Sequence, residues 1–319
     1  LESMGLRPLT AGFANLVWAA ERSGQAVVVK RYTDLVFLRI EPDAIGVVDR
    51  HAEAFGVGPR VLYSSPLGLV AEMLPGRTLE EKDMHKEDWH LLSNVAKALA
   101  KFHKLPVPPK SEGNPMLWRT VDKMMDAVVR RPELIPSGMP TADVILSEIK
   151  SAQDTLDRHR PTIVLGHGDC KPSNIIVSGE RSERVTLIDF ELSGPNYRGF
   201  DLMKLFRTAA GSSETCMRHF LRAYAEACDG SVGEEAVSRL FVEAQMFEPL
   251  TWLEASIFFL TLPMFKADET TRWNALAIDR WSKFTETKHK LLACPMSHVD
   301  CLSLILTIGN TYKEDLESM

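Results

Sequence analysis

Residues 164–201 read VLGHGDCKPSNIIVSGERSERVTLIDFELSGPNYRGFD, and the rest of the chain is organised around this stretch. Two short apolar runs, residues 162–165 and 185–188, each lead into a cluster of polar residues. Short apolar runs bounded by turn residues are typical of strands, and the loops at strand ends often carry functional side chains. The sequence therefore predicts that two strand ends bring five polar residues into one small region: His167, Asp169, Asn174, Asp189 and Glu191.

The spacing of these polar residues indicates a reaction. Asn174 follows Asp169 by five positions, and Asp189 follows it by twenty. In phosphoryl transfer, an Asp orients and deprotonates the acceptor hydroxyl, while an Asn and a second Asp hold the Mg²⁺ ions on the ATP phosphates. HGDxxxxN followed by IDFE therefore predicts a kinase active site. The alternative is a pair of strand ends with solvated carboxylates, but here both clusters occur in the required order, each after an apolar strand.

The composition is that of a globular protein with two lobes or domains. Of its 319 residues, 45% are hydrophobic, so the chain can bury a substantial core. The net charge of −6 and the lack of a long Lys/Arg run argue against binding to nucleic acid or to an anionic membrane surface. The longest apolar stretch, around residues 255–262, is too short to span a bilayer.

The cysteines and the first residues favour a cytoplasmic protein. The five cysteines are an odd number and show no CxxC spacing, which favours reduced thiols. Residues 1–12 lack a charged segment followed by an apolar one, so no secretory signal is expected.

Residues 6–32 predict three strands joined by turns at Gly12 and at Ser23-Gly24. A glycine in such a turn lets backbone N–H groups approach phosphates, and Lys30, at the end of the β-branched run 27–29, can pair with them. Taken alone, the glycine marks only a turn and the lysine a solvated charge. Together with the downstream motif, they predict a nucleotide-binding sheet.

Residues 35–55 predict helical stretches interrupted at Pro42, and they carry several carboxylates. One of these is expected to pair with Lys30, and Glu41 is the first choice. Strands are expected at 60–63 and 69–73, followed by the linker LPGRTL. Backbone groups near Glu72 and Met73 are then placed to meet adenine.

The rest of the chain predicts helices. The clearest is amphipathic, over residues 87–104, and the others are expected at 117–129, 142–156, 202–210, 215–227, 234–247, 250–260 and 270–292, with a short apolar tail at 299–308. The expected fold is therefore α+β. An antiparallel sheet lobe, residues 1–74, binds the nucleotide, and a larger, mainly helical lobe, residues 75–319, carries the catalytic and acceptor-binding residues.

The motifs resemble those of a known group of enzymes. HGDxxxxN with the following IDFE is similar to the aminoglycoside phosphotransferase and choline kinase superfamily, which shares its two-lobed architecture with protein kinases. The continuation PNYRGFDL resembles choline and ethanolamine kinases more specifically. LTAGFANLVW resembles their nucleotide loop, VVVKRY their third strand and EMLPGRTL their hinge, so the resemblance covers about residues 6 to 290.

This resemblance implies a role for each matching residue. Asp169 would be the catalytic base, Asn174 and Asp189 the Mg²⁺ ligands, and Glu191 a neighbour of the second metal or of the substrate amine. His167 and Asp201 would brace the catalytic loop, while Lys30 and Asn15 would serve the nucleotide. The implied cofactors are ATP and Mg²⁺, the implied partner is a small amino alcohol, and the resemblance allows a homodimer.

The acceptor site is expected in the C-terminal half. A quaternary ammonium group cannot donate N–H hydrogen bonds, so it needs aromatic faces and nearby carboxylates. The candidates are Tyr197, Glu248, Trp252, Glu254, Trp273 and Trp281, and of these Glu248 and Trp252 share a helix face at a spacing of four. The alternative is that such tryptophans are core residues, which is the preferred interpretation for Trp273 and Trp281.

Three functions are therefore compared. The leading one is an ATP- and Mg²⁺-dependent kinase that phosphorylates the hydroxyl of choline or ethanolamine. An aminoglycoside or other small-alcohol phosphotransferase is favoured by Gly168, because the eukaryotic choline enzymes usually carry Asn there and the antibiotic kinases Gly. A nucleotide-binding protein without activity is favoured by Ala11 and Ala14, which replace a glycine and a hydroxyl residue of the nucleotide loop. A protein kinase is disfavoured because Glu191 stands where D-F-G needs glycine.

Overall fold

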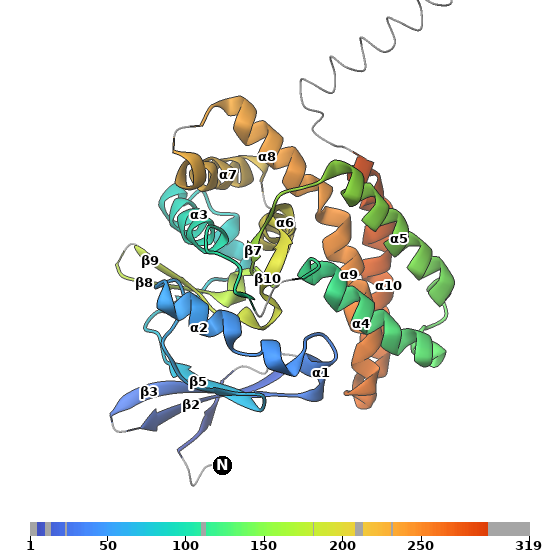
Figure 1. Ribbon diagram of the computed structural model, residues 1–319, viewed down its shortest axis with the longest axis horizontal. Coiled ribbons are helices and arrows are strands. Elements are labelled where there is room, and N and C mark those ends of the chain that lie inside the picture. The colour runs from blue at the N-terminus through green and yellow to red at the C-terminus, as the bar shows by residue number, and fades with distance from the viewer. Residues whose placement is uncertain are drawn as a thin grey trace, which may run out of the picture.

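The computed structural model describes residues 5–9, 14–22, 24–109, 113–180, 182–207, 213–230 and 232–292. Within these ranges the chain forms a two-lobed α+β fold, with an antiparallel sheet in its N-terminal part and a mainly helical C-terminal part (Figure 1). The fold class expected from the sequence is confirmed. Gly12 and the apolar tail at 299–308 lie outside the described residues.

The N-terminal sheet has the strand order β1-β2-β3-β5-β4, and all its pairings are antiparallel. Its strands are β1 (Arg7–Pro8), β2 (Asn15–Arg22), β3 (Gln25–Tyr32), β4 (Val61–Ser65) and β5 (Gly68–Glu72). Lys30 lies on the central strand β3, opposite Val17 of β2 and Leu69 of β5. The β-branched run before Lys30 suits this central position, because branched side chains pack well on a pleated surface.

Between β3 and β4 the chain forms α1 (Asp34–Phe37), the 3₁₀ turn η2 (Pro42–Ala44) and α2 (Val47–Ala54). The break expected at Pro42 is present, because proline begins a new turn and cannot continue the preceding one. Helix α2 lies above the sheet in Figure 1. It contacts the 3₁₀ turn η7 (Phe190–Leu192). A Cβ atom at Gly58, just beyond α2, would lie 2.9 Å from the ring of Phe190. The chain at Gly58 therefore packs tightly against η7.

Two small sheets carry the central motif. In one, β6 (Arg77–Thr78), β8 (Ile175–Ser178) and β9 (Arg184–Leu187) pair in that order, and in the other β7 (Ile163–Gly166) pairs with β10 (Gly194–Tyr197). The segment LPGRTL is therefore more than a linker, because its residues Arg77 and Thr78 pair with Val177 and Ile176. Both small sheets are antiparallel.

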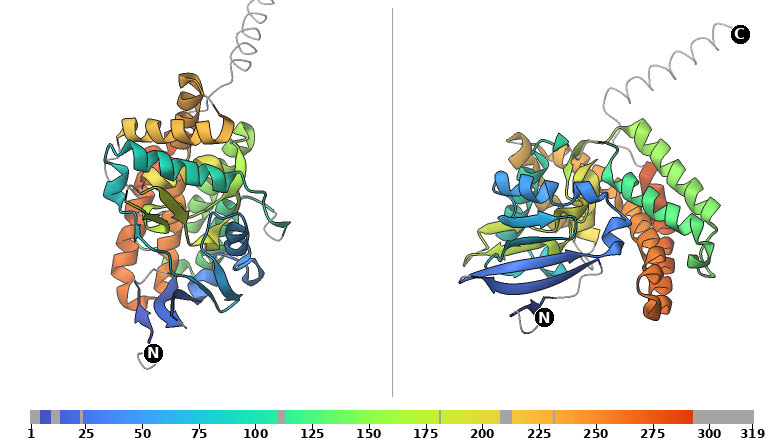
Figure 2. Two further views of the ribbon diagram at one scale, coloured as in Figure 1. Left: turned by 90° about the vertical axis from the view of Figure 1, so that its left-hand side faces the viewer. Right: turned by 60° about the horizontal axis from the view of Figure 1, so that its bottom comes forward.

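The helices of the C-terminal part surround these two sheets (Figure 2). The α-helices are α3 (Trp89–His103), α4 (Met116–Arg130), α5 (Ala142–His159), α6 (Arg198–Arg207), α7 (Glu214–Asp229), α8 (Glu234–Met246), α9 (Glu248–Thr261) and α10 (Thr270–Thr287). Short 3₁₀ turns are η3 (Glu81–Met84), η5 (Pro132–Leu134), η6 (Pro172–Asn174), η7 (Phe190–Leu192), η8 (Leu262–Met264), η9 (Ala267–Glu269) and η10 (Lys288–Leu292). Helix α3 packs on α7, and α9 packs on α10 and α4.

The helices expected from periodicity are confirmed, with differences at their ends. Helix α6 begins at Arg198 rather than near residue 202, directly after β10, because the chain turns from strand to helix without a loop. The predicted helix over 270–292 is α10 followed by the 3₁₀ turn η10. Among the described residues, no helix is both long and apolar enough to cross a membrane.

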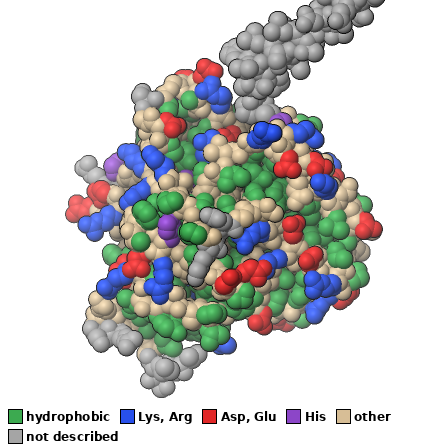
Figure 3. Space-filling view, in the orientation of Figure 1, with side chains coloured by type: hydrophobic (Ala, Val, Ile, Leu, Met, Phe, Trp, Pro, Cys, Tyr) green, Lys and Arg blue, Asp and Glu red, His purple; other side chains and the backbone are tan. Residues whose placement is uncertain are grey.

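The main hydrophobic core lies between α3, the small sheets and helices α6 to α9. Leu92, Val95, Leu99 and Phe102 of α3 are fully buried in it, as the apolar face of the predicted amphipathic helix requires. On the face drawn in Figure 3, basic and acidic side chains are interspersed rather than gathered into one patch of a single sign.

The variant Phe102→Ala tests this core. The ring of Phe102 is fully buried, with centroids 5.2 Å from Phe190 and 6.1 Å from His167. We expect a loss of about 3–5 kcal/mol in the free energy of unfolding, because the cavity cannot close completely. Chemical denaturation measures it. The control Lys97→Ala, at an exposed position of the same helix, should stay within about 0.5 kcal/mol of wild type, and equal effects would contradict the assignment.

Candidate active site

The loop after β7 is held by one buried carboxylate. The backbone N–H groups of His167 and Gly168 donate to Asp201 Oδ2 and Oδ1 at 2.5 and 2.9 Å. His103 of α3 lies 3.1 Å from the same Oδ2 through its Nε2 atom. Burial by itself would raise the pKa of Asp201, but the hydrogen bond from His103 and the charges nearby lower it. Asp201 is thus an ionised anchor at the N-terminal turn of α6.

Gly168 has a geometry that other residues would not tolerate. Its φ is +78°, in the left-handed region, and a Cβ atom there would lie 2.1 Å from the carbonyl oxygen of Leu192. The glycine is therefore required by the close approach of the loop to η7. This local reason explains Gly168 without reference to antibiotic kinases.

The carboxylate of Asp169 lies among cations. Lys171 Nζ is 2.8 Å from Asp169 Oδ2, and Lys204 Nζ is 3.3 Å from Oδ1. The side-chain amide of Asn174 also donates to Asp169 Oδ2, at 3.2 Å. Burial by itself would raise the pKa of Asp169, but Lys171 and Lys204 hold it well below its usual range. Asp169 is therefore ionised at neutral pH.

Lys204 is a buried lysine that joins the loop after β7 to α9. Its side chain donates to the carbonyl oxygen of Gly168 and to Glu254 Oε2, both at 3.1 Å. Only 4% of the residue is exposed. A buried ammonium group is stable only with such partners. The loop that carries Asp169 is therefore tied to the helix that carries Glu254.

The register of β8 and β9 brings Asn174 close to Asp189. Asn174 immediately precedes β8, Asp189 lies two residues after β9, and the backbone N–H of Ile188 donates to the Asn174 carbonyl oxygen at 3.0 Å. His167 Nε2 lies 2.9 Å from the Ile188 carbonyl oxygen, so His167 also holds the residue that precedes Asp189. Asp189 has a φ of +72°, an unfavourable conformation for a residue with a side chain, which is often found at functional sites.

Lys30 reaches this group from the N-terminal sheet. It forms an ion pair with Asp189, and its Nζ is 3.7 Å from Glu191 Oε2. Burial would lower the pKa of Lys30, but Asp189 and Glu191 raise it above its usual value. The carboxylate of Asp49, on α2, also raises the pKa of Lys30. Burial raises the pKa of Asp49 itself, and the opposing charge of Lys30 lowers it.

The expectation that Glu41 pairs with Lys30 is wrong. Glu41 is exposed and forms an ion pair with Lys123 of α4. The turn at η2 directs this carboxylate towards α4, whereas the buried carboxylate of α2 that acts on Lys30 is Asp49. The choice between neighbouring acidic residues depends on how α2 packs on the sheet.

Glu191, in η7, contacts two residues of the N-terminal part of the chain. The Asn15 side chain donates to Glu191 Oε2 at 2.6 Å, and Arg39 Nη2 is 3.5 Å from Oε1. Burial and the charge of Asp189 raise the pKa of Glu191 to about 7, against the opposing effect of Lys30. Asn15 Oδ1 is buried and has no hydrogen-bond partner among the described residues, so this position offers an unused oxygen.

The residues expected to meet adenine lie at the end of β5. The Met73 N–H donates to the Ala26 carbonyl oxygen at 3.1 Å, and Glu72 Oε1 accepts from the Arg60 N–H at 2.8 Å. Since the Met73 N–H is used within the sheet, an adenine contact at this residue would rely on its carbonyl oxygen.

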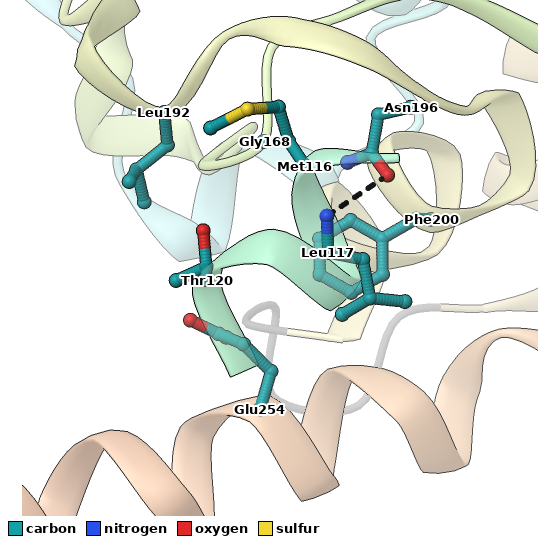
Figure 4. Close-up of a pocket in the computed structure, with 8 residues that line it drawn as sticks. All are labelled: Met116, Leu117, Thr120, Gly168, Leu192, Asn196, Phe200 and Glu254. Atoms are coloured by element: carbon teal, nitrogen blue, oxygen red, sulfur yellow. Dashed lines mark hydrogen bonds between the residues drawn. The ribbon is translucent and has the colours of Figure 1, made fainter. Parts of the chain in front are cut away.

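A pocket adjoins the loop after β7 (Figure 4). Glu254 of α9 lies at one end of it and Asn196 of β10 at the other, where Asn196 Oδ1 accepts from the Leu117 N–H at 3.4 Å. Gly168, beside Asp169, also lines it. The complete lining is Met116, Leu117, Thr120, Gly168, Leu192, Asn196, Phe200 and Glu254.

Tyr197, a candidate for the acceptor site, does not line this pocket. Tyr197 is buried in the core, where its OH accepts from Trp118 Nε1 at 3.1 Å and its ring packs on Phe247. Successive side chains of a strand point to opposite faces, so the preceding residue of β10, Asn196, faces the pocket instead.

Glu248 and Trp252 also lie away from this pocket. Glu248 forms an ion pair with Lys290. The Trp252 ring is covered by the guanidinium group of Arg207, 4.4 Å from its centroid. On a helix, residues two apart do not share a face, so Glu254 lines the pocket while Trp252 does not.

The donor set fits a hard cation such as Mg²⁺. Mg²⁺ in kinases is held by one or two carboxylates together with substrate phosphates. Asp189 offers a carboxylate, and the Asn174 side chain uses its NH₂ group on Asp169, which leaves its oxygen as the acceptor. Among the described residues, no group of three or more His, Cys, Asp or Glu side chains forms a separate metal site.

Sequence reasoning did not identify four charged residues of this site: Arg39, Asp49, Lys171 and Lys204. Lys204 carries a signal, since it is the only charged residue in the apolar run LMKLF, residues 202–206. A lysine in such a run is buried only with a partner. Arg39 carries no comparable signal, because its partner Glu191 lies far away in the sequence.

The chain is similar in sequence to known proteins over most of its length. The model of the choline/ethanolamine kinase family matches residues 6–285. Choline kinase alpha of Mus musculus is 30% identical over 155 residues, which covers 46% of this chain and 34% of that protein. The chain therefore matches about a third of this relative's length.

Solved structures show the same fold. An ethanolamine kinase of Plasmodium vivax has a TM-score of 0.73 at 19% identity, and the match covers 89% of this chain and 82% of that one. An ADP-bound aminoglycoside phosphotransferase has a TM-score of 0.57 at 15% identity, covering 86% and 94%. At these identities the likeness establishes a kinase-like fold.

The variant Gly168→Ala tests the geometry of the loop. Its Cβ would collide with the Leu192 carbonyl oxygen, so the loop must shift. Gly24→Ala is the matched control, because Gly24 has a φ of +74° but nothing within 4 Å of the added atom. The control should lose about 1–2 kcal/mol from the left-handed backbone alone.

Gly168→Ala should lose about 1–3 kcal/mol more than the control, which is the range for overpacking. Urea denaturation of both variants gives the two free energies of unfolding. Equal losses would show that the contact with Leu192 does not constrain the loop.

Proposed function

The chain belongs to the choline/ethanolamine kinase family, whose model matches residues 6–285, and from this premise we propose that it is an ATP-dependent kinase. The acceptor in this proposal is the hydroxyl group of a small amino alcohol of the choline and ethanolamine type. The supporting observation is that Asp169, on a loop anchored by Asp201, lies within hydrogen-bond distance of Asn174 and directly follows Gly168, which lines the pocket of Figure 4.

Asp169 is the proposed proton acceptor. Its carboxylate is ionised at neutral pH, because Lys171 and Lys204 hold its pKa low. A carboxylate of low pKa is a weak base, so its main contribution is to orient the hydroxyl and to take the proton late in the transfer. The hydroxyl would enter from the pocket that Gly168 and Glu254 line.

Lys171 and Lys30 are the proposed cations for the phosphate groups. Both already pair with carboxylates of the site, Lys171 with Asp169 and Lys30 with Asp189. Fixed charges in a partly buried site stabilise developing negative charge without reorganisation. Asn174 and Asp189 would hold Mg²⁺, which would neutralise phosphate charge when bound, and Glu191 lies beside them.

The nucleotide is assigned to the N-terminal lobe. In this proposal residues 1–74 bind ATP, with Asn15 and Lys30 on the phosphate side and Glu72 and Met73 on the adenine side. Residues 75–319 supply the catalytic loop and the acceptor pocket. A cytoplasmic location is part of the proposal, since the reaction needs ATP and Cys170, Cys216 and Cys228 are free thiols.

An assay of ADP release with choline and with ethanolamine tests the proposal. We expect acceptor-dependent turnover by the wild-type protein and a loss of about 10²- to 10⁴-fold in kcat for Asp169→Ala, the range for a general base. Asp126→Ala, an exposed position on α4, is the control and should keep wild-type rates. A folded protein that binds Mg-ATP but transfers phosphate to neither alcohol would favour the inactive nucleotide-binding protein instead.

The roles of Asp169 and Asp189 are separable by nucleotide affinity. Asp169→Ala should bind Mg-ATP nearly as tightly as wild type, because this group acts mainly in the transition state. Asp189→Ala should bind Mg-ATP about tenfold or more weakly, because it removes a metal ligand. Isothermal titration calorimetry measures both, and identical affinities would contradict the division of roles.

A further inference from the structure

A second hollow adjoins the first on the side of the N-terminal lobe. Its lining comes from the segment between α1 and α2, from α4 and from residues 191–193: Arg39, Ile40, Glu41, Ala44, Met116, Arg119, Lys123, Glu191 and Ser193. We call it the linker–α4 pocket. Met116 lines both hollows, and Leu192 of the first lies between Glu191 and Ser193 of the second. The linker–α4 pocket is therefore next to the acceptor pocket.

The linker–α4 pocket has more basic than acidic side chains. Arg39, Arg119 and Lys123 face only two carboxylates, Glu41 and Glu191. Glu41 is already paired with Lys123. The Arg119 guanidinium makes no ion pair with any residue that the structure describes, and its Nη1 donates only to a sulfur atom, Met116 Sδ, at 3.3 Å. One cation of the pocket is therefore available.

Arg39 is the second cation with unused hydrogen-bonding capacity. It is 7% exposed, and its Nη2 lies 3.5 Å from Glu191 Oε1, at the outer limit of a hydrogen bond. Its Nε is buried and has no hydrogen-bond partner in the described part of the chain. An unsatisfied buried N–H is unfavourable, so an acceptor atom is expected there in the functional complex.

The aromatic rings near both pockets already carry cations of the protein. The Arg39 guanidinium lies 4.9 Å from the ring centroid of Phe258, and Lys204 Nζ lies 5.2 Å from that of Phe200. A quaternary ammonium ligand without a carboxylate gains its affinity from aromatic faces. Here protein cations already cover these faces, and their positive charge repels such a ligand.

We propose, on the premise of the kinase function above, that the linker–α4 pocket binds a carboxylate of the acceptor through Arg39 and Arg119. The preferred acceptor is then an amino alcohol that also carries a carboxylate, that is, a hydroxylated zwitterion. A guanidinium group binds a carboxylate through two parallel N–H···O bonds, and the unused N–H groups of these two arginines supply them. The ammonium group of the same ligand lies towards Glu254, and its hydroxyl towards Asp169.

Two matched pairs of acceptors test the inference. Serine is ethanolamine with a carboxylate, and carnitine is choline with a carboxymethyl group on the hydroxyl carbon. For the wild-type protein we expect kcat/KM for at least one carboxylated member to exceed that of its partner by about 10- to 100-fold, the range for hydrogen bonds to a charged group. Serinamide, which keeps the amine and the hydroxyl but lacks the negative charge, should fall to the level of ethanolamine.

Variants assign the effect to the pocket. Arg119→Gln should lower kcat/KM for the carboxylated acceptor by about tenfold or more, mainly through KM, and leave that for its uncharged partner within about twofold. Arg119 is half-buried and its guanidinium makes no ion pair with a described residue, so this variant should fold. Arg130→Gln on the same helix is the control, because Arg130 is exposed and pairs with Asp126 outside the pocket.

The outcomes separate this inference from the proposed function. Higher kcat/KM for ethanolamine and choline than for both carboxylated partners would overturn the inference and support the kinase function. The same holds if Arg119→Gln lowers kcat/KM equally for both members of a pair. Transfer to none of these alcohols by a folded protein that binds Mg-ATP would overturn both.

Discussion

The site depends on the buried carboxylate of Asp201. It accepts the N–H groups of His167 and Gly168, and His103 of α3 approaches it from the other side. A buried charge is stable only when such partners surround it, so the loop, α3 and α6 are fixed relative to one another. Asp169 follows directly in this loop, and Gly168 allows the loop to lie against Leu192. The position of the proposed base is therefore a consequence of the packing of three elements.

The charges around this anchor balance one another without a ligand. Lys30 pairs with Asp189, Lys171 and Lys204 pair with Asp169, and Lys204 also reaches Glu254. Such pairing keeps Asp169 and Asp189 ionised, as the lowered pKa of each shows. A nucleotide with its metal would replace some of these pairs by equivalent ones, so the polar groups need little reorganisation. The linker–α4 pocket is different, because Arg39 and Arg119 keep donors without a partner in the part of the chain that the structure describes.

Several features could be predicted because they depend on local sequence. The apolar periodicity of residues 87–104 gave helix α3, the β-branched run before Lys30 gave the central strand, and Pro42 marked the break between α1 and α2. His167 and Asp169 follow β7, Asn174 precedes β8 and Asp189 follows β9, so the motif records three strand ends, of which those of β8 and β9 pair in register. Glu41 pairs with Lys123 rather than Lys30, and Tyr197, Glu248 and Trp252 do not line the pocket of Figure 4, because burial and facing direction are set by neighbours distant in the sequence.

The sequence by itself determined the fold class, the central motif and the family to which the chain belongs, since these depend on local propensity and on residue order. Only the tertiary structure decided which charges meet. Asp49, rather than Glu41, is the buried carboxylate of the α1–α2 region that acts on Lys30, Lys204 lies against Asp169, and Glu254 rather than Trp252 faces the pocket. The physical reason is that long-range pairs depend on the packing of whole helices and sheets, and a shift of one or two helical positions moves a side chain to another face.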